Sequence, residues 1–322
     1  MSSVLEVNDL QIEFQIDEQY YKAVQNVSFH IKAGETLGLV GESGCGKSVT
    51  SMALMRLLKQ PTKISGEVLY HGRDLLTISE SEMRQVRGNE LGMIFQEPMT
   101  SLNPVHKIGR QIGETLLLHR GMKSNEARKE AIAMLKQVGI PRPEQIVDDY
   151  PHQLSGGMRQ RVMIAIAMAC NPKLLIADEP TTALDVTIQA QILDLMRNLA
   201  KENGTSILLI THDLGVVAEM CERVAVMYAG RIVEEGPVRK IFHNPQHPYT
   251  RGLLSSIPKL TGERKRLDSI DGNVPSLRNM PDGCRFAPRC PFVMDKCIKH
   301  NPDLFQVEDE HTSRCWLQEG GQ

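Results

Sequence analysis

Short segments that alternate between apolar and polar residues run through the chain up to about residue 90. Val27–Ile31 and Gly66–Tyr70 are two of them. This period of two predicts β-strands with one buried face. Thr36–Val40 is instead a continuous apolar run, which predicts a strand buried on both faces.

A helical pattern follows from about residue 105 to residue 153. Apolar residues at helical spacing come after Ser124, namely Ala127, Ala131, Met134, Leu135 and Val138. From about residue 171 apolar runs return at Leu174–Ala177 and Ser206–Thr211, with helical segments between them, and the pattern closes near Pro237. Buried strands that alternate with helices predict an α/β fold.

Length and charge agree with one large α/β domain and a smaller appendage. The chain has 322 residues, a formal net charge of −2 and no polybasic run, which disfavours nucleic acid as the main partner. No apolar run approaches the 18 or so residues of a membrane span, and the N-terminus lacks a signal-peptide pattern. We therefore expect a chain that stays in the cytoplasm.

A phosphate-binding loop is the first candidate site. Gly41 to Ser48 fits the pattern G-x-x-x-x-G-K-[ST] directly after the buried strand, so backbone N–H groups and a helix start would face phosphate oxygens. Lys47 would contact the outer phosphates and Ser48 would hold Mg²⁺. A Gly-rich turn without a ligand is the alternative, which the strand and helix context disfavours. The expected ATP contacts here are Ser43, Gly44, Cys45, Gly46, Lys47, Ser48 and Val49.

Two further strands end in polar residues, where ligands bind in parallel sheets. Leu174–Ala177 leads into Asp178, expected to hold Mg²⁺ through water, and Glu179, expected to polarise the attacking water. Two solvated acids are the alternative, but Pro180 breaks the strand where a site loop is needed. His212 follows the third strand and could reach a γ-phosphate, although a lone histidine is commonly an ordinary loop residue.

Leu154-Ser-Gly-Gly-Met-Arg-Gln160 resembles the signature sequence of the ATP-binding subunits of ABC transporters. Ser155 is a suitable N-cap for a helix over Met158–Cys170. The resemblance implies an ABC-type P-loop ATPase fold with an antiparallel β subdomain and a helical subdomain at about residues 105–165. It also implies two ATP molecules between two ATPase subunits, with the ATP of the partner subunit bound by Ser155, Gly156, Gly157, Arg159 and Gln160.

The same resemblance assigns roles to three more residues whose own signals are weak. Gln96 would join Mg²⁺ and the attacking water to the transmembrane partner, and Asp185, in Ala183-Leu-Asp185, would communicate across the dimer. The family stacks adenine on an aromatic residue upstream of the phosphate loop. Tyr21 is our choice over Tyr20 and Phe14, the alternative being an aromatic that is simply packed.

The C-terminal segment narrows the resemblance. His247-Pro-Tyr-Thr250 and Gly252-Leu-Leu-Ser-Ser-Ile-Pro are similar to the extension of ATPase subunits that serve dipeptide, oligopeptide and nickel importers. The implied domains are a nucleotide-binding domain over residues 1–240 and an extension over residues 241–322. Four of the seven cysteines lie in that extension: Cys284, Cys290, Cys297 and Cys315.

The four cysteines are candidates for a metal site. Their gaps of five, six and seventeen residues do not fit the tight pairs of structural zinc, and disulfides are not expected in a reducing cytoplasm. Pro288 and Pro291 flank Cys290 and stiffen the chain, and the pair Cys290-Pro291 resembles ferredoxin-like cluster loops. The resemblance implies a [4Fe–4S] cluster that staples the segment, while Zn²⁺ and four packed thiols stay open. Cys45 is either a reactive thiol in the phosphate loop or a small residue at a variable position.

Together these features predict an ATPase subunit that couples ATP binding and hydrolysis to uptake of dipeptides or oligopeptides. The resemblance implies two transmembrane permease subunits, a heterodimer with a related ATPase, and an external substrate-binding protein that acts indirectly. It places the subunit on the cytoplasmic face of the membrane. Nickel uptake, a soluble ABC ATPase and a P-loop kinase are the alternatives. The signature argues against the kinase, and a soluble ABC ATPase usually carries two ATPase units or long inserted arms, which are not visible here.

Overall fold

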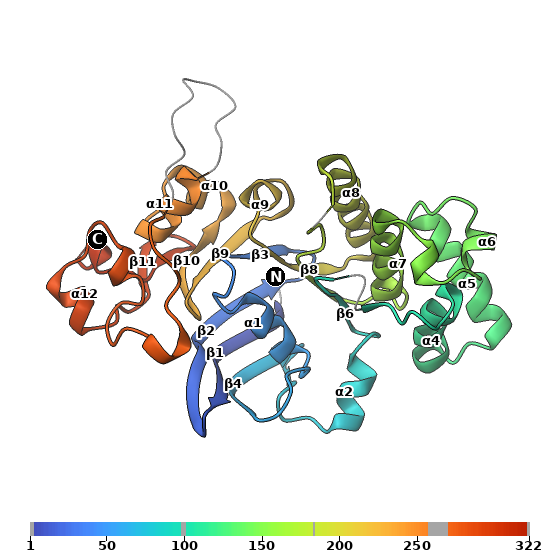
Figure 1. The fold of residues 1–322 in the computed structure, drawn as a ribbon, viewed down its shortest axis with the longest axis horizontal. Coiled ribbons are helices and arrows are strands. Elements are labelled where there is room, and N and C mark those ends of the chain that lie inside the picture. The colour runs from blue at the N-terminus through green and yellow to red at the C-terminus, as the bar shows by residue number, and fades with distance from the viewer. Residues whose placement is uncertain (1–2, 98–100, 183, 257–269, 321–322) are drawn as a thin grey trace. The chain divides into compact units, whose positions relative to one another are not determined.

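The structure is a computed structural model that describes residues 3–97, 101–182, 184–256 and 270–320. It divides into two compact units (Figure 1). The first unit comprises Met1–Val4, Ile31–Glu35 and Thr77–Leu209, and the second comprises Leu5–His30, Thr36–Leu76 and Ile210–Gln322. The phosphate loop belongs to the second unit, and the signature segment belongs to the first.

The first unit combines neighbouring strands with a group of helices. Its strands lie in the order β8 (Ser206–Thr211, which ends in the second unit), β7 (Leu174–Asp178) and β6 (Leu91–Ile94), and β6 runs parallel to β7 with Met93 opposite Ile176. Its helical elements are α2 (Glu80–Val86), α4 (Ile108–Arg120), α5 (Ser124–Gln137), α6 (Pro143–Ile146), η1 (Pro151–Gln153), α7 (Gly156–Met168) and α8 (Val186–Asn203).

The helix predicted after Ser124 is confirmed as α5. The apolar positions Ala127, Ala131 and Leu135 are buried on one face. The Lys123 N–H donates to Glu126 Oε2 at 2.9 Å, which satisfies one of the backbone donors that a helix start leaves free. This part of the chain is helical because both its apolar spacing and the hydrogen bond at its first turn favour a helix.

The second unit contains an antiparallel sheet and a second run of strands. The antiparallel sheet has the order β2 (Gln19–Lys32), β1 (Ser3–Ile16), β4 (Thr62–Tyr70) and β5 (Arg73–Asp74), which confirms the predicted antiparallel part. The second run has the order β11 (Phe305–Glu308), β12 (His311–Ser313), β10 (Arg231–Pro237), β9 (Arg223–Tyr228) and β3 (Thr36–Val40). Its helical elements are α1 (Lys47–Leu54), α9 (Leu214–Met220), α10 (Val238–His243), α11 (Pro248–Ser255), η2 (Leu277–Asn279), η3 (Ala287–Arg289), α12 (Asp295–Lys299) and η4 (Trp316–Gln318).

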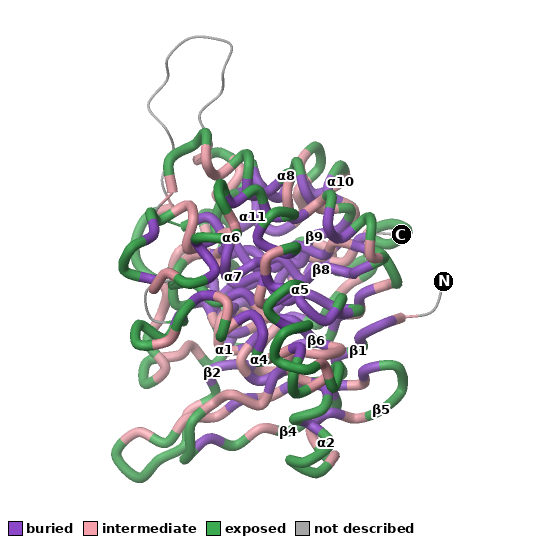
Figure 2. The backbone as a smooth tube through the Cα atoms, turned by 90° about the vertical axis from the view of Figure 1, so that its right-hand side faces the viewer, coloured by how far each residue is buried: buried purple, intermediate pink, exposed green. Residues whose placement is uncertain are grey.

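The strands predicted from continuous apolar runs are the most deeply buried elements. Every residue of the predicted strands β7 and β8 is buried. The same holds for β9, which was not predicted, and the tube coloured by burial shows β8 and β9 (Figure 2). In the second unit β3 runs parallel to β9, with Leu39 opposite Ala225. Parallel strands covered on both faces have no solvent side, which explains why these segments lack polar alternation.

The segment after Ile241 packs into the second unit. Its strand β12 pairs with β10, with Ser313 opposite Glu234, and its aromatic residues Tyr249 and Phe286 join the same buried cluster as Val226 and Tyr228. The boundary at residue 240 stays a prediction.

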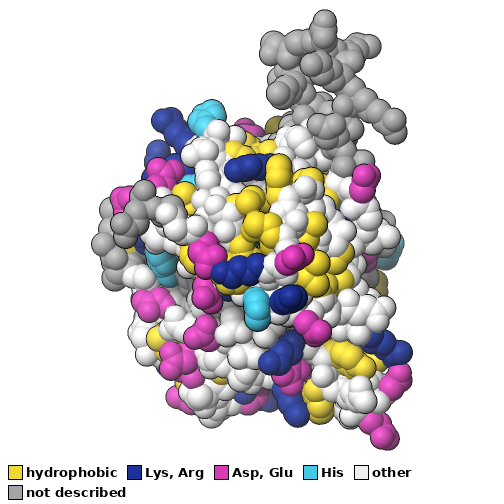
Figure 3. Space-filling view, turned by 90° about the vertical axis from the view of Figure 1, so that its left-hand side faces the viewer, with side chains coloured by type: hydrophobic (Ala, Val, Ile, Leu, Met, Phe, Trp, Pro, Cys, Tyr) yellow, Lys and Arg dark blue, Asp and Glu magenta, His cyan; other side chains and the backbone are white. Residues whose placement is uncertain are grey.

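The end of the segment leaves apolar side chains exposed. Figure 3 looks at this side and shows hydrophobic side chains gathered among Lys and Arg side chains. Such a short segment cannot bury all its apolar surface by itself. The exposed large hydrophobic residues of this region are Phe292, Val293, Met294, Ile298, Leu304 and Leu317.

Candidate active site

The phosphate loop lies between the end of β3 and the first residue of α1. Gly41 has φ 155° and Gly46 has φ 108°, a region that favours glycine. A Cβ on Gly41 would lie 2.1 Å from the carbonyl oxygen of Met227, so no side chain fits there. The loop therefore takes its path because glycines stand at its two tightest points. Ser43 and Gly44 at its tip are exposed.

Lys47 is 4 % exposed, and its ammonium group is held by the loop itself. Nζ donates to the carbonyl oxygens of Gly41 at 2.8 Å and Glu42 at 3.1 Å. A buried ammonium needs such partners, because an unpaired charge in the interior is costly. Ser48 and Val49 follow in the first turn of α1, both half-buried. Lys47 and Ser48 therefore stand together at the helix start, as the motif predicts.

Cys45 in the same loop is a buried thiol. It is 1 % exposed, and burial raises the pKa of its thiol. Its carbonyl oxygen accepts a hydrogen bond from the Gly230 N–H at 2.7 Å. A buried, neutral thiol is a poor nucleophile. Of the two interpretations of Cys45, the structure favours a small packed residue.

In the first unit, Asp178 and Glu179 stand at the end of β7. Asp178 is 4 % exposed and is the last residue of the strand. Glu179 has φ 48°, a left-handed conformation that is uncommon for a side chain of this kind and that concentrates at functional sites. Glu179 Oε2 accepts hydrogen bonds from Gln96 Nε2 at 3.0 Å and from Thr182 Oγ1 at 2.8 Å.

This arrangement brings together two residues that the sequence assigned to the attacking water. Gln96 and Glu179 are 83 positions apart and come from different segments of the first unit. Two donors fix the carboxylate of Glu179 in one orientation, which is what a group that orients a nucleophile needs. Sequence reasoning did not include Thr182, the second of these donors.

The signature segment begins α7 as predicted. Ser155 caps the helix, because its Oγ accepts from the Met158 N–H at 3.3 Å. Gly156 is exposed, with open space beside its Cα, and Gly157 is half-buried. The helix ends at Met168, two residues before the predicted end. The start of α7 thus offers N–H groups to the outside of the first unit.

Two residues of this segment differ in their surroundings. Gln160 is 2 % exposed, and its Nε2 donates to the carbonyl oxygen of Pro180 at 2.5 Å. Its side chain is therefore used inside its own chain. Arg159 is half-buried, and its Nε has no hydrogen-bond partner among the described residues. Contacts of either residue with the ATP of a partner subunit stay predictions.

The remaining predicted site residues lie at element ends. Asp185 is the N-cap of α8 and accepts from the Ile188 N–H at 3.0 Å, while Ala183 lies outside the described residues. His212 is exposed directly after β8. Tyr21 is half-buried, and its hydroxyl donates to Gln19 Oε1 at 3.0 Å. The adenine contact of Tyr21 stays a prediction.

The four cysteines of the extension are free thiols. In the part of the chain that the structure describes, no three His, Cys, Asp or Glu residues are arranged to hold a metal ion. A metal site made of Cys284, Cys290, Cys297 and Cys315 therefore stays a prediction. The thiols do lie close enough to interact. Burial and, to a smaller extent, the other three cysteines raise the pKa of Cys315 to about 11.

Two family descriptions match the chain. Residues 24–182 match the ABC transporter family, and residues 233–297 match the C-terminal region of oligopeptide and dipeptide transporters. The oligopeptide transport ATP-binding protein AppD of Bacillus subtilis is 56 % identical over 321 residues, which are 99 % of this chain and 98 % of the relative. The chain belongs to the family of ABC transporter ATP-binding proteins.

Other relatives of this ABC protein agree. The oligopeptide transport ATP-binding protein OppD of Bacillus subtilis is 54 % identical, over 98 % of this chain and 89 % of OppD. A solved dimeric structure of the ATP-binding cassette MJ0796 with ADP and Pi has a TM-score of 0.66 at 30 % identity, over 73 % of this chain and 99 % of that chain. The fold is therefore the ABC ATPase cassette, the activity is ATP hydrolysis, and ATP with Mg²⁺ is expected.

No helix in the described parts of this ABC ATPase is long and apolar enough to cross a membrane.

The structure also reveals a contact that the motifs could not indicate. Glu42, at a variable position of the phosphate loop, is held by Tyr249 and Arg289 of the C-terminal extension. Its sequence signal is only an acidic residue inside a phosphate-binding motif.

Proposed function

We propose that this ABC ATPase drives the uptake of short peptides, dipeptides or oligopeptides, from the cytoplasmic face of a membrane. The main support for the proposal is the match of residues 233–297 to the C-terminal region of oligopeptide and dipeptide transporters. The relative AppD, which is named for oligopeptide transport, also aligns with nearly the whole chain. Its partners would be two transmembrane permease subunits and a second, related ATPase. An external binding protein would act through the permease.

We assign the residue roles from the motifs, and contacts inside each unit support them. Ser43 to Val49 would surround the phosphates. Lys47 would exchange its hydrogen bonds to the carbonyls of Gly41 and Glu42 for contacts with the phosphates. Ser48 and Asp178 are the oxygen ligands suited to Mg²⁺, which neutralises phosphate charge when bound. Tyr21 would stack on adenine. His212, exposed at the end of β8, would contact the γ-phosphate.

Glu179 would orient the attacking water. Its carboxylate is oriented by the hydrogen bonds that Oε2 accepts from Gln96 and Thr182. Ser155, Gly156 and Gly157 would bind the ATP of the partner subunit through N–H groups at the start of α7. Asp185, with Arg159 and Gln160, completes the set proposed for the dimer.

We further propose that the four thiols hold a [4Fe–4S] cluster, with Zn²⁺ as the alternative. The chemistry of the surroundings supports an anionic group. Arg285 is 7 % exposed, and burial together with the charges of Arg231 and Arg314 lowers its pKa to about 10. Its donors bind neutral oxygens, on Ala229 and Gln25. Burial raises the pKa of Cys284, Cys290 and Cys315, so these thiols would have to give up their protons when they bind a metal.

The cluster is tested by metal analysis of anaerobically purified protein. About four iron atoms and four sulfide ions per chain, lost in a Cys284→Ser variant, support the cluster. One zinc atom per chain supports the alternative. Protein that contains neither iron nor zinc would indicate four packed thiols.

Copurification tests the transport assignment. The tagged chain is isolated from native membranes in mild detergent, and the associated chains are identified by mass spectrometry. Two multispan proteins and a second ATPase support the importer, whereas ribosomal proteins or nucleic acid without a membrane protein contradict it. Uptake of a labelled dipeptide, a labelled tetrapeptide and Ni²⁺ by the same complex then separates the substrate classes.

A further inference from the structure

The C-terminal extension holds the phosphate loop by a two-pronged ion pair. Arg289 Nη1 lies 2.7 Å from Glu42 Oε2, and Arg289 Nη2 lies 3.0 Å from Glu42 Oε1. The Arg289 side chain is 4 % exposed and that of Glu42 is 31 % exposed. A bidentate pair with one partner fully enclosed fixes both position and orientation, unlike a surface ion pair between flexible side chains.

The extension also fixes Arg289 from its other side. Nε donates to the carbonyl oxygen of Asp271 at 2.8 Å, and Nη2 donates to that of Ile270 at 3.1 Å. Together with the Tyr228 hydroxyl, 3.4 Å from Nη1, these backbone partners orient the guanidinium so that both Nη1 and Nη2 reach the Glu42 carboxylate. The side chain is therefore set before any nucleotide binds.

A second contact reaches the backbone of the same loop residue. The Glu42 N–H donates to the hydroxyl oxygen of Tyr249 at 2.8 Å. Tyr249 is fully buried in α11, with its ring centroid 4.6 Å from that of Tyr228 and 5.5 Å from that of Phe286. Burial raises the pKa of Tyr249, so the hydroxyl stays neutral. A packed ring thus holds the backbone of Glu42.

The held residue is directly coupled to the loop lysine. The carbonyl of Glu42 accepts from Lys47 Nζ, and so does the carbonyl of Gly41, the neighbouring residue. A shift of Glu42 would move both acceptors. The extension also lines the loop tip, because Glu42, Ser43 and Gly44 border a hollow of about 570 Å³ whose other wall is formed by residues 273–277.

We propose that Arg289 and Tyr249 are positioning residues for ATP binding, through Glu42. The extension acts on the phosphate loop in two ways. It fixes the loop path that presents N–H groups to phosphate, and it neutralises a carboxylate that would otherwise repel a polyanion from inside the binding motif. The affinity of this subunit for ATP therefore depends on a segment outside the ATPase motifs.

The test is a double-mutant cycle on the full chain, read as the Kd of MgATP by calorimetry. Arg289→Gln leaves the carboxylate unpaired and should weaken ATP binding about tenfold, while Glu42→Gln removes the charge and should weaken it about threefold. The double variant should resemble Glu42→Gln, because the repelling charge is gone. Independent effects would instead multiply to about thirtyfold and would overturn the proposal.

Three further variants separate positioning from general damage. Tyr249→Phe should weaken MgATP about threefold by removing one hydrogen bond to the loop backbone. Arg289→Lys should lie between wild type and Arg289→Gln, since it keeps the charge and loses the fork. Arg278→Gln is the matched control, because Arg278 lies in the same extension and pairs with exposed Asp17.

The kinetic readout is the split between KM and kcat. In the ATPase assay KM for ATP should rise with Kd, and kcat at saturating ATP should stay within about twofold of wild type. If Arg289→Gln does not fold, the Kd values of Glu42→Gln and Tyr249→Phe test the proposal instead, the first at the loop residue and the second at the ring that holds it. Wild-type Kd values for both would refute the proposal, whatever substrate the transporter carries.

Discussion

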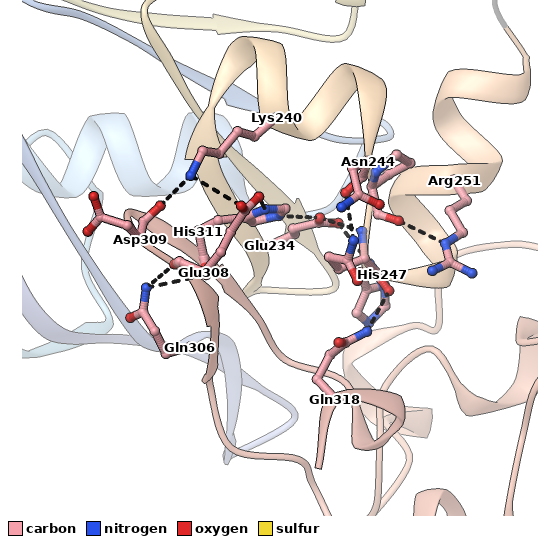
Figure 4. Close-up of polar contacts among 12 residues, drawn as sticks. Glu234, Lys240, Asn244, His247, Arg251, Gln306, Glu308, Asp309, His311 and Gln318 are labelled. Atoms are coloured by element: carbon pink, nitrogen blue, oxygen red, sulfur yellow. Dashed lines mark hydrogen bonds and ion pairs between the residues drawn. The ribbon is translucent and has the colours of Figure 1, made fainter. Parts of the chain in front are cut away.

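His247 anchors the C-terminal extension and should make its folding sensitive to acid. The ring is 1 % exposed, and its Nδ1 accepts from the Tyr249 N–H at 3.0 Å at the start of α11. The His247 N–H donates to Glu234 Oε2 at 2.9 Å (Figure 4). Burial lowers the pKa of His247 to about 4. The perturbation we consider is His247→Asn, which keeps a capping acceptor and removes the titrating ring.

The magnitude follows from the difference between the folded and unfolded pKa values. An unfolded histidine titrates near pH 6.5, so the shift is about 2.5 units, or about 3 kcal/mol at its limit. The folded pKa is the lower one, so the unfolded chain binds the proton first. Stability is therefore unaffected above about pH 7, falls as pH drops through 6.5, and reaches the full loss below about pH 4.

His311 touches the same carboxylate and has the opposite sign. Its Nε2 lies 2.8 Å from Glu234 Oε1, and its Nδ1 lies 3.3 Å from Glu308 Oε1. Burial by itself would lower the pKa of His311, but the interactions with Glu234 and Glu308 outweigh it and raise the pKa. Its contribution is present below pH 6.5 and is lost as pH rises through the folded pKa. The two histidines thus act in adjoining pH ranges.

The assay is urea unfolding at several pH values between 4.5 and 7.5, followed by the emission of Trp316. This is the only tryptophan of the chain and lies in η4 of the extension. Wild type should lose about 2.5 kcal/mol more than His247→Asn between pH 7.5 and pH 4.5. His243→Asn, at an exposed position of α10, is the control and should behave as wild type. Equal losses in wild type and His247→Asn would refute the reasoning.

Three further outcomes are expected. Glu179→Gln should leave the Kd of ATP within about twofold and slow steady-state turnover by at least about 100-fold, because the group that orients water loses its charge; unchanged turnover would remove Glu179 from that role. Cys45→Ser should retain ATPase activity, and iodoacetamide should modify native Cys45 far more slowly than unfolded protein, as followed by mass spectrometry; rapid native labelling would contradict its burial. Phe286→Ala should lower the free energy of unfolding by about 3 to 5 kcal/mol in the Trp316 assay, because Phe286 fills the space beside Tyr228; a loss below about 1 kcal/mol would show that the cluster is loosely packed.

The elements that the sequence predicts well are those with a strong local pattern. The buried runs Thr36–Val40 and Ser206–Thr211 are strands with those bounds, and Ser155 caps the signature helix. Each is determined by apolar spacing or by the hydrogen-bonding capacity of one side chain within a few residues. Local chemistry and the folded structure agree at these positions.

Contacts between distant segments could not be read in this way. Glu42 and Arg289 are 247 positions apart, and nothing in either local sequence indicates the other. Gln160 looks like an exposed residue near a helix start, yet one hydrogen bond to Pro180 turns it inward. The four cysteines show which atoms are available, whereas their relative positions depend on how the extension packs against β9 and β10.

Peptide uptake by cells is the most direct test of whether this ATPase drives peptide import. Cells that lack this chain are supplied with wild type, Glu179→Gln or Arg278→Gln, and the uptake of a radiolabelled oligopeptide is measured under conditions in which all three variants are expressed equally. We expect wild type and Arg278→Gln to restore uptake, and we expect Glu179→Gln not to restore it. Uptake that is normal without the chain, or that Glu179→Gln restores fully, would contradict the account.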